Sequence, residues 1–170
     1  MPKTAELPAR VERVIHASPA ETWTALTTPE SLKQFFFGAD VETDWSVGSP
    51  IRMTGEFKGK KYEDKGDIIA FEPQTRLSFS HWSAMSGKAD KPENYHVVTF
   101  ELLPSGAATK VTLTQSNLAG GVSAADIDHR SEYEKNWSSV LEGLAKLFSL
   151  TRTTGQSRRD GVRPVRLPTE

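Results

Sequence analysis

The chain has 170 residues and a formal net charge of −1, which suits one globular domain and gives no bulk electrostatic reason to bind nucleic acid or a membrane surface. It contains no cysteine, which excludes structural disulfides, thiolate metal sites and a cysteine nucleophile. No stretch approaches the ~18 apolar residues of a membrane span, and the first residues, MPKTAELPAR, lack the apolar region of a signal peptide, so we expect a cytoplasmic protein.

The first part of the chain predicts one strand followed by two short helices. Residues 11–16 form a run rich in β-branched residues, which favours a strand. Ser18 and Thr28 are each followed by proline and then by an acid, the pattern of a helix N-terminus with a hydroxyl cap. Ser18 also has the capping-box spacing with Glu21. These two short helices are expected to form a corner that closes one side of the domain.

The middle of the chain predicts a meander of antiparallel strands. Apolar and polar residues alternate there, which indicates strands with one buried face. We expect strands over residues 39–45, 51–57, 62–71, 76–81, 95–102 and 110–115. Gly66 indicates a bulge or bend within its strand, and residues 84–92 and 118–130 read as loops.

The last predicted element is a long amphipathic helix that covers the apolar face of the sheet. Its apolar stripe consists of Tyr133, Trp137, Val140, Leu141, Leu144, Leu147 and Phe148. From Thr153 onward no periodicity remains and several arginines follow, so we expect a domain over residues 1–152 and a flexible basic tail over 153–170. The tail either is solvated or contacts an acidic partner.

Several segments resemble one known family when they are taken in order. They are I-x-A-S-P-A-E-T-W-T-A-L-T-T-P-E at 15–30, the aromatic segment 34–37, D-W-S-V-G at 44–48, G-D-I-I-A-F-E-P at 66–73, R-L-S-F-S-H-W at 76–82 and the closing helix around 137–144. The chain is similar to the SRPBCC (START/Bet v 1-like) superfamily, and within it to the domain related to the activator of Hsp90 ATPase. The resemblance implies an α+β helix-grip fold, in which a curved antiparallel sheet wraps around a long C-terminal helix. Phe35 departs from the tryptophan that is common in the family.

The resemblance implies several kinds of activity and no single one. Superfamily members bind lipids, hormones and polyketides, some are cyclases or hydrolases, and others assist chaperones, which implies a role in stress responses. The family shares no catalytic motif that can be placed on this chain, so no catalytic residue is assigned. We expect no cofactor and no metal.

Two histidines are placed where a strand pattern would bring them together. His81 and His96 both fall on the apolar phase of their strands, and the strands flank one loop. If Leu77 pairs with Phe100, then His81 faces His96, with Cβ atoms about 5 Å apart. Such residues are either polar groups at the rim of the sheet or the polar end of a ligand pocket. Two imidazoles could also transfer protons, whereas a zinc site would need a third ligand that the pattern does not supply.

Aromatic and apolar side chains of the corner, the strands and the closing helix are either ordinary core or the wall of a cavity. The candidate pocket residues are Trp23, Phe35, Phe36, Trp45, Phe79, His81, His96, Val98, Phe100, Leu113, Gln115, Trp137, Leu141 and Leu144.

The first expected function is non-covalent binding of a small hydrophobic or amphipathic molecule between the sheet and the C-terminal helix. One alternative is a co-chaperone-like domain that engages an Hsp90-type ATPase through its surface. The other is a cyclase-like or hydrolase-like enzyme that uses the end of the pocket at His81 and His96. The pattern favours a binding protein over an enzyme, with a small molecule or a chaperone as its partner and no nucleic acid or membrane.

Overall fold

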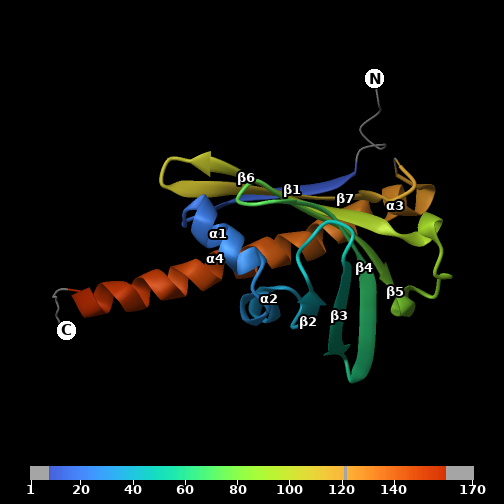
Figure 1. The fold of residues 1–170 in the computed structure, drawn as a ribbon, viewed down its shortest axis with the longest axis horizontal. Helices are drawn as coiled ribbons and strands as arrows, with labels where there is room; N and C mark the ends of the chain where they lie inside the picture. The colour runs from blue at the N-terminus through green and yellow to red at the C-terminus, as the bar shows by residue number, and fades with distance from the viewer. Residues whose placement is uncertain (1–7, 121, 160–170) are drawn as a thin grey trace.

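The computed structural model describes residues 8–120 and 122–159 (Figure 1). Its strands are β1 (Ala9–Ile15), β2 (Asp40–Thr43), β3 (Pro50–Phe57), β4 (Lys60–Glu72), β5 (Arg76–Ser83), β6 (His96–Ser105) and β7 (Ala108–Asn117). Its α-helices are α1 (Pro19–Leu26), α2 (Pro29–Phe35), α3 (Ala124–Asp128) and α4 (Arg130–Arg159), and two short 3-10 helices, η2 (Ala84–Ser86) and η3 (Pro92–Asn94), lie between β5 and β6. The predicted α+β order of strand, two helices, meander and closing helix is confirmed.

The strands form one seven-stranded sheet with the order β1-β7-β6-β5-β4-β3-β2, in which all neighbours are antiparallel. The predicted pairing of β5 with β6 is confirmed, because Leu77 lies opposite Phe100 and His81 lies opposite His96. The register of β4 against β5 shifts between Ile68 and Ala70. This irregularity comes two residues after Gly66, where the sequence predicted a bulge or bend.

Gly66 lies close against the backbone of β5. A Cβ atom at this position would lie 1.7 Å from the backbone oxygen of Ser80. Any side chain would therefore push the two strands apart, so only glycine lets the buried part of β4 pair here.

The corner helices begin where the sequence predicted, with one difference in detail. Ser18 and Glu21 form the predicted capping box of α1. Thr28 is the N-cap of α2, yet its hydroxyl does not cap that helix. It donates instead to the carbonyl of Thr24 in the last turn of α1, because α2 follows so closely that this carbonyl is within reach.

The segment after β7 contains a helix that the sequence analysis read as loop. Helix α3 begins after Ser123, which forms a capping box with Asp126. The spacing S-x-x-D is a helix-start signal that the two glycines nearby obscured. Helix α4 then runs to Arg159, past the predicted boundary at residue 152, and residues 160–170 of the predicted tail lie outside the described residues. Among the described helices, none has the length and apolar character needed to cross a membrane.

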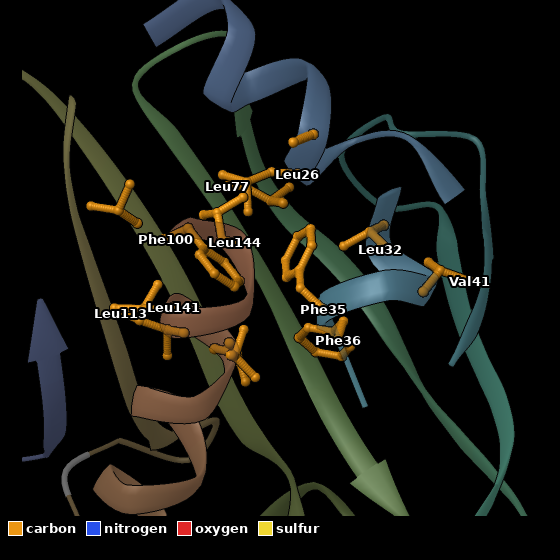
Figure 2. Packing of buried hydrophobic residues seen from close by; sticks show 14 of the residues in the cluster. Leu26, Leu32, Phe35, Phe36, Val41, Leu77, Phe100, Leu113, Leu141 and Leu144 are labelled. Carbon is orange, nitrogen blue, oxygen red and sulfur yellow. The ribbon is translucent and has the colours of Figure 1, made fainter. Parts of the chain in front are cut away.

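The core lies between the sheet, the two corner helices and the predicted stripe of α4. Trp137, Val140, Leu141 and Leu144 are buried on that stripe. Figure 2 shows Leu141 and Leu144 beside Phe100 and Leu113 of the sheet, with Phe35 of α2 and the adjoining Phe36 next to them.

Helix α2 packs so closely on α4 that a Cβ atom at Gly143 would lie 2.9 Å from the Cβ atom of Phe35. Side chains of the corner, β3, β5 and β6 enclose a space of only about 10 Å³. The residues that line it include Leu26, Phe36, Trp45, Phe79 and Phe100. This apolar part of the interior is therefore filled.

Candidate functional site

The polar end of the interior holds two histidine–aspartate pairs side by side on the sheet. Nε2 of His81 lies 2.8 Å from Oδ2 of Asp64, and Nε2 of His96 lies 2.8 Å from Oδ1 of Asp126. The side chains of all four residues are largely but not fully buried. The two imidazoles that the sequence placed face to face are therefore each held by a carboxylate from a different element.

Asp64 comes from β4, where it lies opposite Ser83 of β5 and Met53 of β3. It follows Tyr62 on the inward phase of the strand, so its carboxylate points to the same side as that ring. One of its oxygens holds His81, while the other, Oδ1, is buried and has no hydrogen-bond partner among the described residues. Buried carboxylate oxygens without partners are rare, which makes Asp64 a candidate ligand-binding group.

Asp126 is held in place by the start of helix α3. Its carboxylate accepts hydrogen bonds from the backbone N–H of Ser123, at 3.2 Å, and from His96. Burial by itself would raise the pKa of Asp126, but the hydrogen bonds from His96 and Ser123 outweigh burial and lower it. The carboxylate is therefore ionised at neutral pH and can hold the ring of His96 in one orientation.

Helix α4 is joined to the sheet at this end by a buried hydrogen bond. Nε1 of Trp137 donates to Oε1 of Gln115 on β7 at 2.6 Å. The ring of Trp137 also lies near those of Phe36 and Phe37, with centroids 5.9 and 5.7 Å away. Trp137 thus links the polar end of the sheet to the aromatic end of α2.

Two spaces adjoin these residues. The space that we call the outer cleft has a volume of about 530 Å³ and lies between the β5–β6 connection and the helices α3 and α4. Its lining includes His81 and His96, together with His129, Trp82, Lys88 and Glu132.

The space that we call the inner compartment has a volume of about 180 Å³. Its lining residues are Phe36, Phe37, Ala39, Met53, Tyr62, Asp64, His81, Gln115, Tyr133, Asn136 and Trp137. His81, Gln115, Tyr133 and Trp137 line both spaces, so these four side chains form the junction between them.

A further hollow of about 720 Å³ is an open groove on the outside of β3 and β4. Charged residues such as Lys33, Asp40 and Glu63 line it, and Lys33 and Asp40 form an ion pair across 3.0 Å. Because it is open and its Lys33 and Asp40 are already paired with each other, it is a weaker candidate than the polar end.

The structure divides the predicted pocket residues into two groups. Five of them line the inner compartment, the outer cleft or both, namely Phe36, His81, His96, Gln115 and Trp137. The others lie in the filled part of the interior or pack against it, namely Trp23, Phe35, Trp45, Phe79, Val98, Phe100, Leu113, Leu141 and Leu144. Contact of any of these residues with a ligand remains a prediction.

Several residues that line the polar end are not among the predicted pocket residues. Asp64 could have been found, because it shares the inward phase of its strand with Tyr62 and Ile68. Asp126 lies in a segment whose composition predicts a loop, although the capping-box spacing with Ser123 marks it. Phe37 gave no usable signal, because its position depends on a left-handed backbone (φ 56°) just after α2.

The chemistry available at the polar end is hydrogen bonding and proton transfer. Within the parts of the chain that the structure describes, no three His, Cys, Asp or Glu side chains gather as a metal site would require. A histidine whose Nε2–H donates to a carboxylate keeps a lone pair on Nδ1, which can accept a proton or a hydrogen bond.

Comparison with known proteins agrees with this architecture. Residues 16–149 match the sequence profile of a family described as activator of Hsp90 ATPase homolog 1-like protein. The solution structure of ChR145 from Cytophaga hutchinsonii is 42% identical, with a TM-score of 0.69, and the match covers 86% of this chain and 97% of that one. A search of curated proteins found no match.

More distant structures share the fold. MLL2253 from Mesorhizobium loti is 23% identical with a TM-score of 0.67, and the match covers 85% of this chain and 98% of that one. NE0264 from Nitrosomonas europaea is 19% identical with a TM-score of 0.67, and the match covers 89% of this chain and 99% of that one.

Proposed function

The chain belongs to the activator of Hsp90 ATPase homolog 1-like family of the SRPBCC superfamily, and we propose that it binds a small amphipathic molecule at the polar end of its helix-grip domain. One part of the ligand occupies the inner compartment, and the rest of it reaches the outer cleft. Family membership supports ligand binding in general terms, and the geometry of the polar end supports the position that we propose for the ligand.

The observation that carries this proposal is the contrast between the two ends of the interior. Toward Leu26 and Phe100 the side chains leave only about 10 Å³, whereas the inner compartment leaves about 180 Å³ and adjoins a larger cleft. Its walls are mostly aromatic and apolar, and a few polar groups, Asp64, His81 and Gln115, face the same space. Ligand sites typically combine apolar walls with a few fixed polar groups.

Native mass spectrometry of the protein purified from its own cell extract tests the proposal. We expect a retained small molecule that is released on denaturation. Asn136 is an exposed residue of α4 that lines the inner compartment, so Asn136→Trp should block it and abolish retention. Lys135→Trp places the same side chain on the solvent side of the same helix and should retain the molecule. Equal retention by both variants would place the ligand elsewhere.

A second candidate is acid–base catalysis on the bound molecule, of the cyclase or hydrolase kind. The observation that favours it is the pair of imidazoles, each oriented by a carboxylate, in the lining of one cleft. His81 would take a proton from the ligand or from a water molecule, and His96 would return one.

Exchange of ligand hydrogens with deuterium in D₂O, followed by NMR, tests this candidate once the retained molecule is known. His81→Ala should abolish exchange while thermal unfolding stays cooperative. Unchanged exchange in this variant rejects the catalytic role and leaves the binding role in place.

The co-chaperone alternative rests on the family's description. It predicts that the chain raises the ATPase rate of an Hsp90-type chaperone through surface contacts. An ATPase assay with the chain and its Asn136→Trp variant separates the two functions, because a surface role does not depend on an open inner compartment.

A further inference from the structure

Five aromatic side chains surround the inner compartment together with one carboxylate. Phe36 and Phe37 follow directly after α2, Tyr62 comes from β4, and Tyr133 and Trp137 come from α4. Asp64 is the lining carboxylate, and among the described residues the lining contains no lysine or arginine. We propose that the inner compartment binds an alkylated ammonium group, an inference that rests on the proposed ligand-binding function and names its chemical class.

The rings are arranged as the walls of a cage and not as a stack. Phe36 and Phe37 are inclined by 63° with centroids 5.4 Å apart, and Trp137 is inclined to them by 39° and 58°. None of these three ring pairs is stacked face to face, which leaves ring faces for a guest. The faces of aromatic rings carry negative charge and attract cations within about 6 Å of the ring centre, most of all quaternary ammonium groups.

The charges around the compartment favour a cation. Asp64 holds His81 with one oxygen, and its second oxygen is buried without a partner among the described residues. Burial raises the pKa of Tyr62, and the negative charges of Asp64 and Asp40 raise it further. Burial likewise raises the pKa of Tyr133, with Asp126 and Glu132 adding to it. A negative potential that disfavours a tyrosinate stabilises a bound ammonium ion by the same attraction.

The size of the compartment suits a compact head group. Its 180 Å³ equals about six times the ~30 Å³ that a water molecule occupies in the liquid. A trimethylammonium group with one attached carbon chain fits such a space, and the chain leads past the junction residues into the outer cleft. An anionic head group would meet the Asp64 carboxylate. A bare metal ion would find, in the part of the lining that the structure describes, one carboxylate and one imidazole.

NMR titration of the full chain with choline tests the inference. The matched control ligand is neopentylcarbinol, the neutral alcohol in which carbon replaces the choline nitrogen. Because the two ligands have the same shape, their difference measures the charge alone. We expect choline to bind about tenfold more tightly and to shift the signals of Phe37, Tyr62 and Trp137. Equal affinities, or binding of neither ligand, would overturn the inference.

Two variants assign the effect to the cage. Phe37 is half exposed, so Phe37→Leu removes a ring while it keeps apolar bulk and should fold normally. We expect it to weaken choline about fivefold and to leave neopentylcarbinol unchanged. Asp64→Asn keeps an acceptor for His81 and removes the charge, and it should also weaken choline selectively. Leu103→Ala, at an exposed position of β6, is the control that should change neither affinity.

Unchanged choline affinity in Phe37→Leu overturns the inference even if Asp64→Asn fails to fold. The identity of the molecule retained in native mass spectrometry distinguishes a failure of the ammonium assignment from a failure of the proposed ligand-binding function. A retained amphipathic molecule without a cationic nitrogen, displaced by Asn136→Trp, upholds the binding site and overturns the ammonium assignment.

Discussion

The hydrogen bond between Trp137 and Gln115 shows how one polar contact fixes a helix on a sheet. Both side chains are buried, with exposed fractions of 8% and 9%, so neither atom can turn to bulk water instead. The indole of Trp137 has a single N–H to donate, and the side-chain oxygen of Gln115 on β7 accepts it at 2.6 Å. The contact therefore fixes the distance of α4 from the sheet at the polar end. It also positions the junction residues between the inner compartment and the outer cleft.

Gln115→Leu should lower the free energy of unfolding by about 1–3 kcal/mol, because it leaves a buried indole N–H without an acceptor. Urea denaturation measures the change. In a Trp137→Phe background the same substitution should cost less, because the unsatisfied donor is gone. An equal cost in both backgrounds would mean that the hydrogen bond contributes little and that Gln115 acts through packing alone.

Asp126 makes stability depend on pH in a defined direction. Its pKa in the folded protein lies below the unfolded value, because the hydrogen bonds from His96 and Ser123 outweigh the effect of burial. A carboxyl group of this kind stabilises the folded state at every pH above its unfolded pKa. The stabilisation is lost as the pH falls through the lowered folded pKa.

Asp126→Asn should therefore be less stable than the wild type by about 1–2 kcal/mol at pH 6, since a hydrogen bond to a charged group becomes a neutral one. The gap should narrow below about pH 4, where the wild-type carboxyl group becomes protonated in the unfolded chain and then in the folded one. Urea denaturation at several pH values measures it, with Asp128→Asn at an exposed position of the same helix as control. A gap that stays constant down to pH 2 would contradict this role.

Among the elements, the contact of α2 with α4 depends on a glycine inside a helix. Glycine at an exposed helix position costs about 1 kcal/mol relative to alanine, so Gly143 by itself weakens α4. This cost in helix stability is offset by the close packing that glycine allows. The Cβ and Cα atoms of Phe35 would lie 2.9 and 3.3 Å from a Cβ added at Gly143. The contact joins the backbone of α4 at Gly143 to the Cα and Cβ atoms of Phe35 in α2. Neither side can move without a shift of its helix.

Gly143→Ala should thus destabilise the protein by about 1–3 kcal/mol despite the better helix propensity of alanine, because overpacking forces α2 away from α4. Thermal unfolding measures the change. Ser139→Ala, on the solvent side of the same helix, is the matched control and should be neutral or slightly stabilising. A more stable Gly143→Ala would show that α2 can shift without cost.

The elements also show why some pairings can be predicted from the sequence and others cannot. His81 and His96 could be placed opposite each other, because β5 and β6 alternate regularly and their apolar residues fix the register. The pairing of His81 with Asp64 could not, because the β4–β5 register shifts between Ile68 and Ala70. An irregularity of one residue moves every later cross-strand pair, and its position depends on how the strands bend around the core.

For the whole molecule, the sequence predicted the helix-grip architecture correctly, since the order and periodicity of the elements leave few ways to cover one curved sheet. It did not predict which part of the interior is open. Trp137 and Phe79 carry the same apolar signal, yet Trp137 lines the inner compartment while Phe79 lies in the filled core. Whether a space remains depends on the summed volumes of side chains from distant elements, which no local pattern records.

Because the filled core and the inner compartment are separate, stability and binding should respond to different substitutions. Leu26→Ala, at a fully buried position of α1, should lower the free energy of unfolding by about 2–5 kcal/mol. The folded fraction of this variant should still retain the native ligand. Asn136→Trp, at an exposed position, should lose the ligand and change stability by less than about 1 kcal/mol.

Chemical denaturation together with native mass spectrometry measures both quantities on the same samples. The ligand itself adds stability in proportion to the logarithm of its concentration over its dissociation constant, so denaturation is done after its removal. If folded Leu26→Ala releases the ligand as readily as Asn136→Trp does, the two regions are one space. The division that positions the site at the polar end would then be wrong.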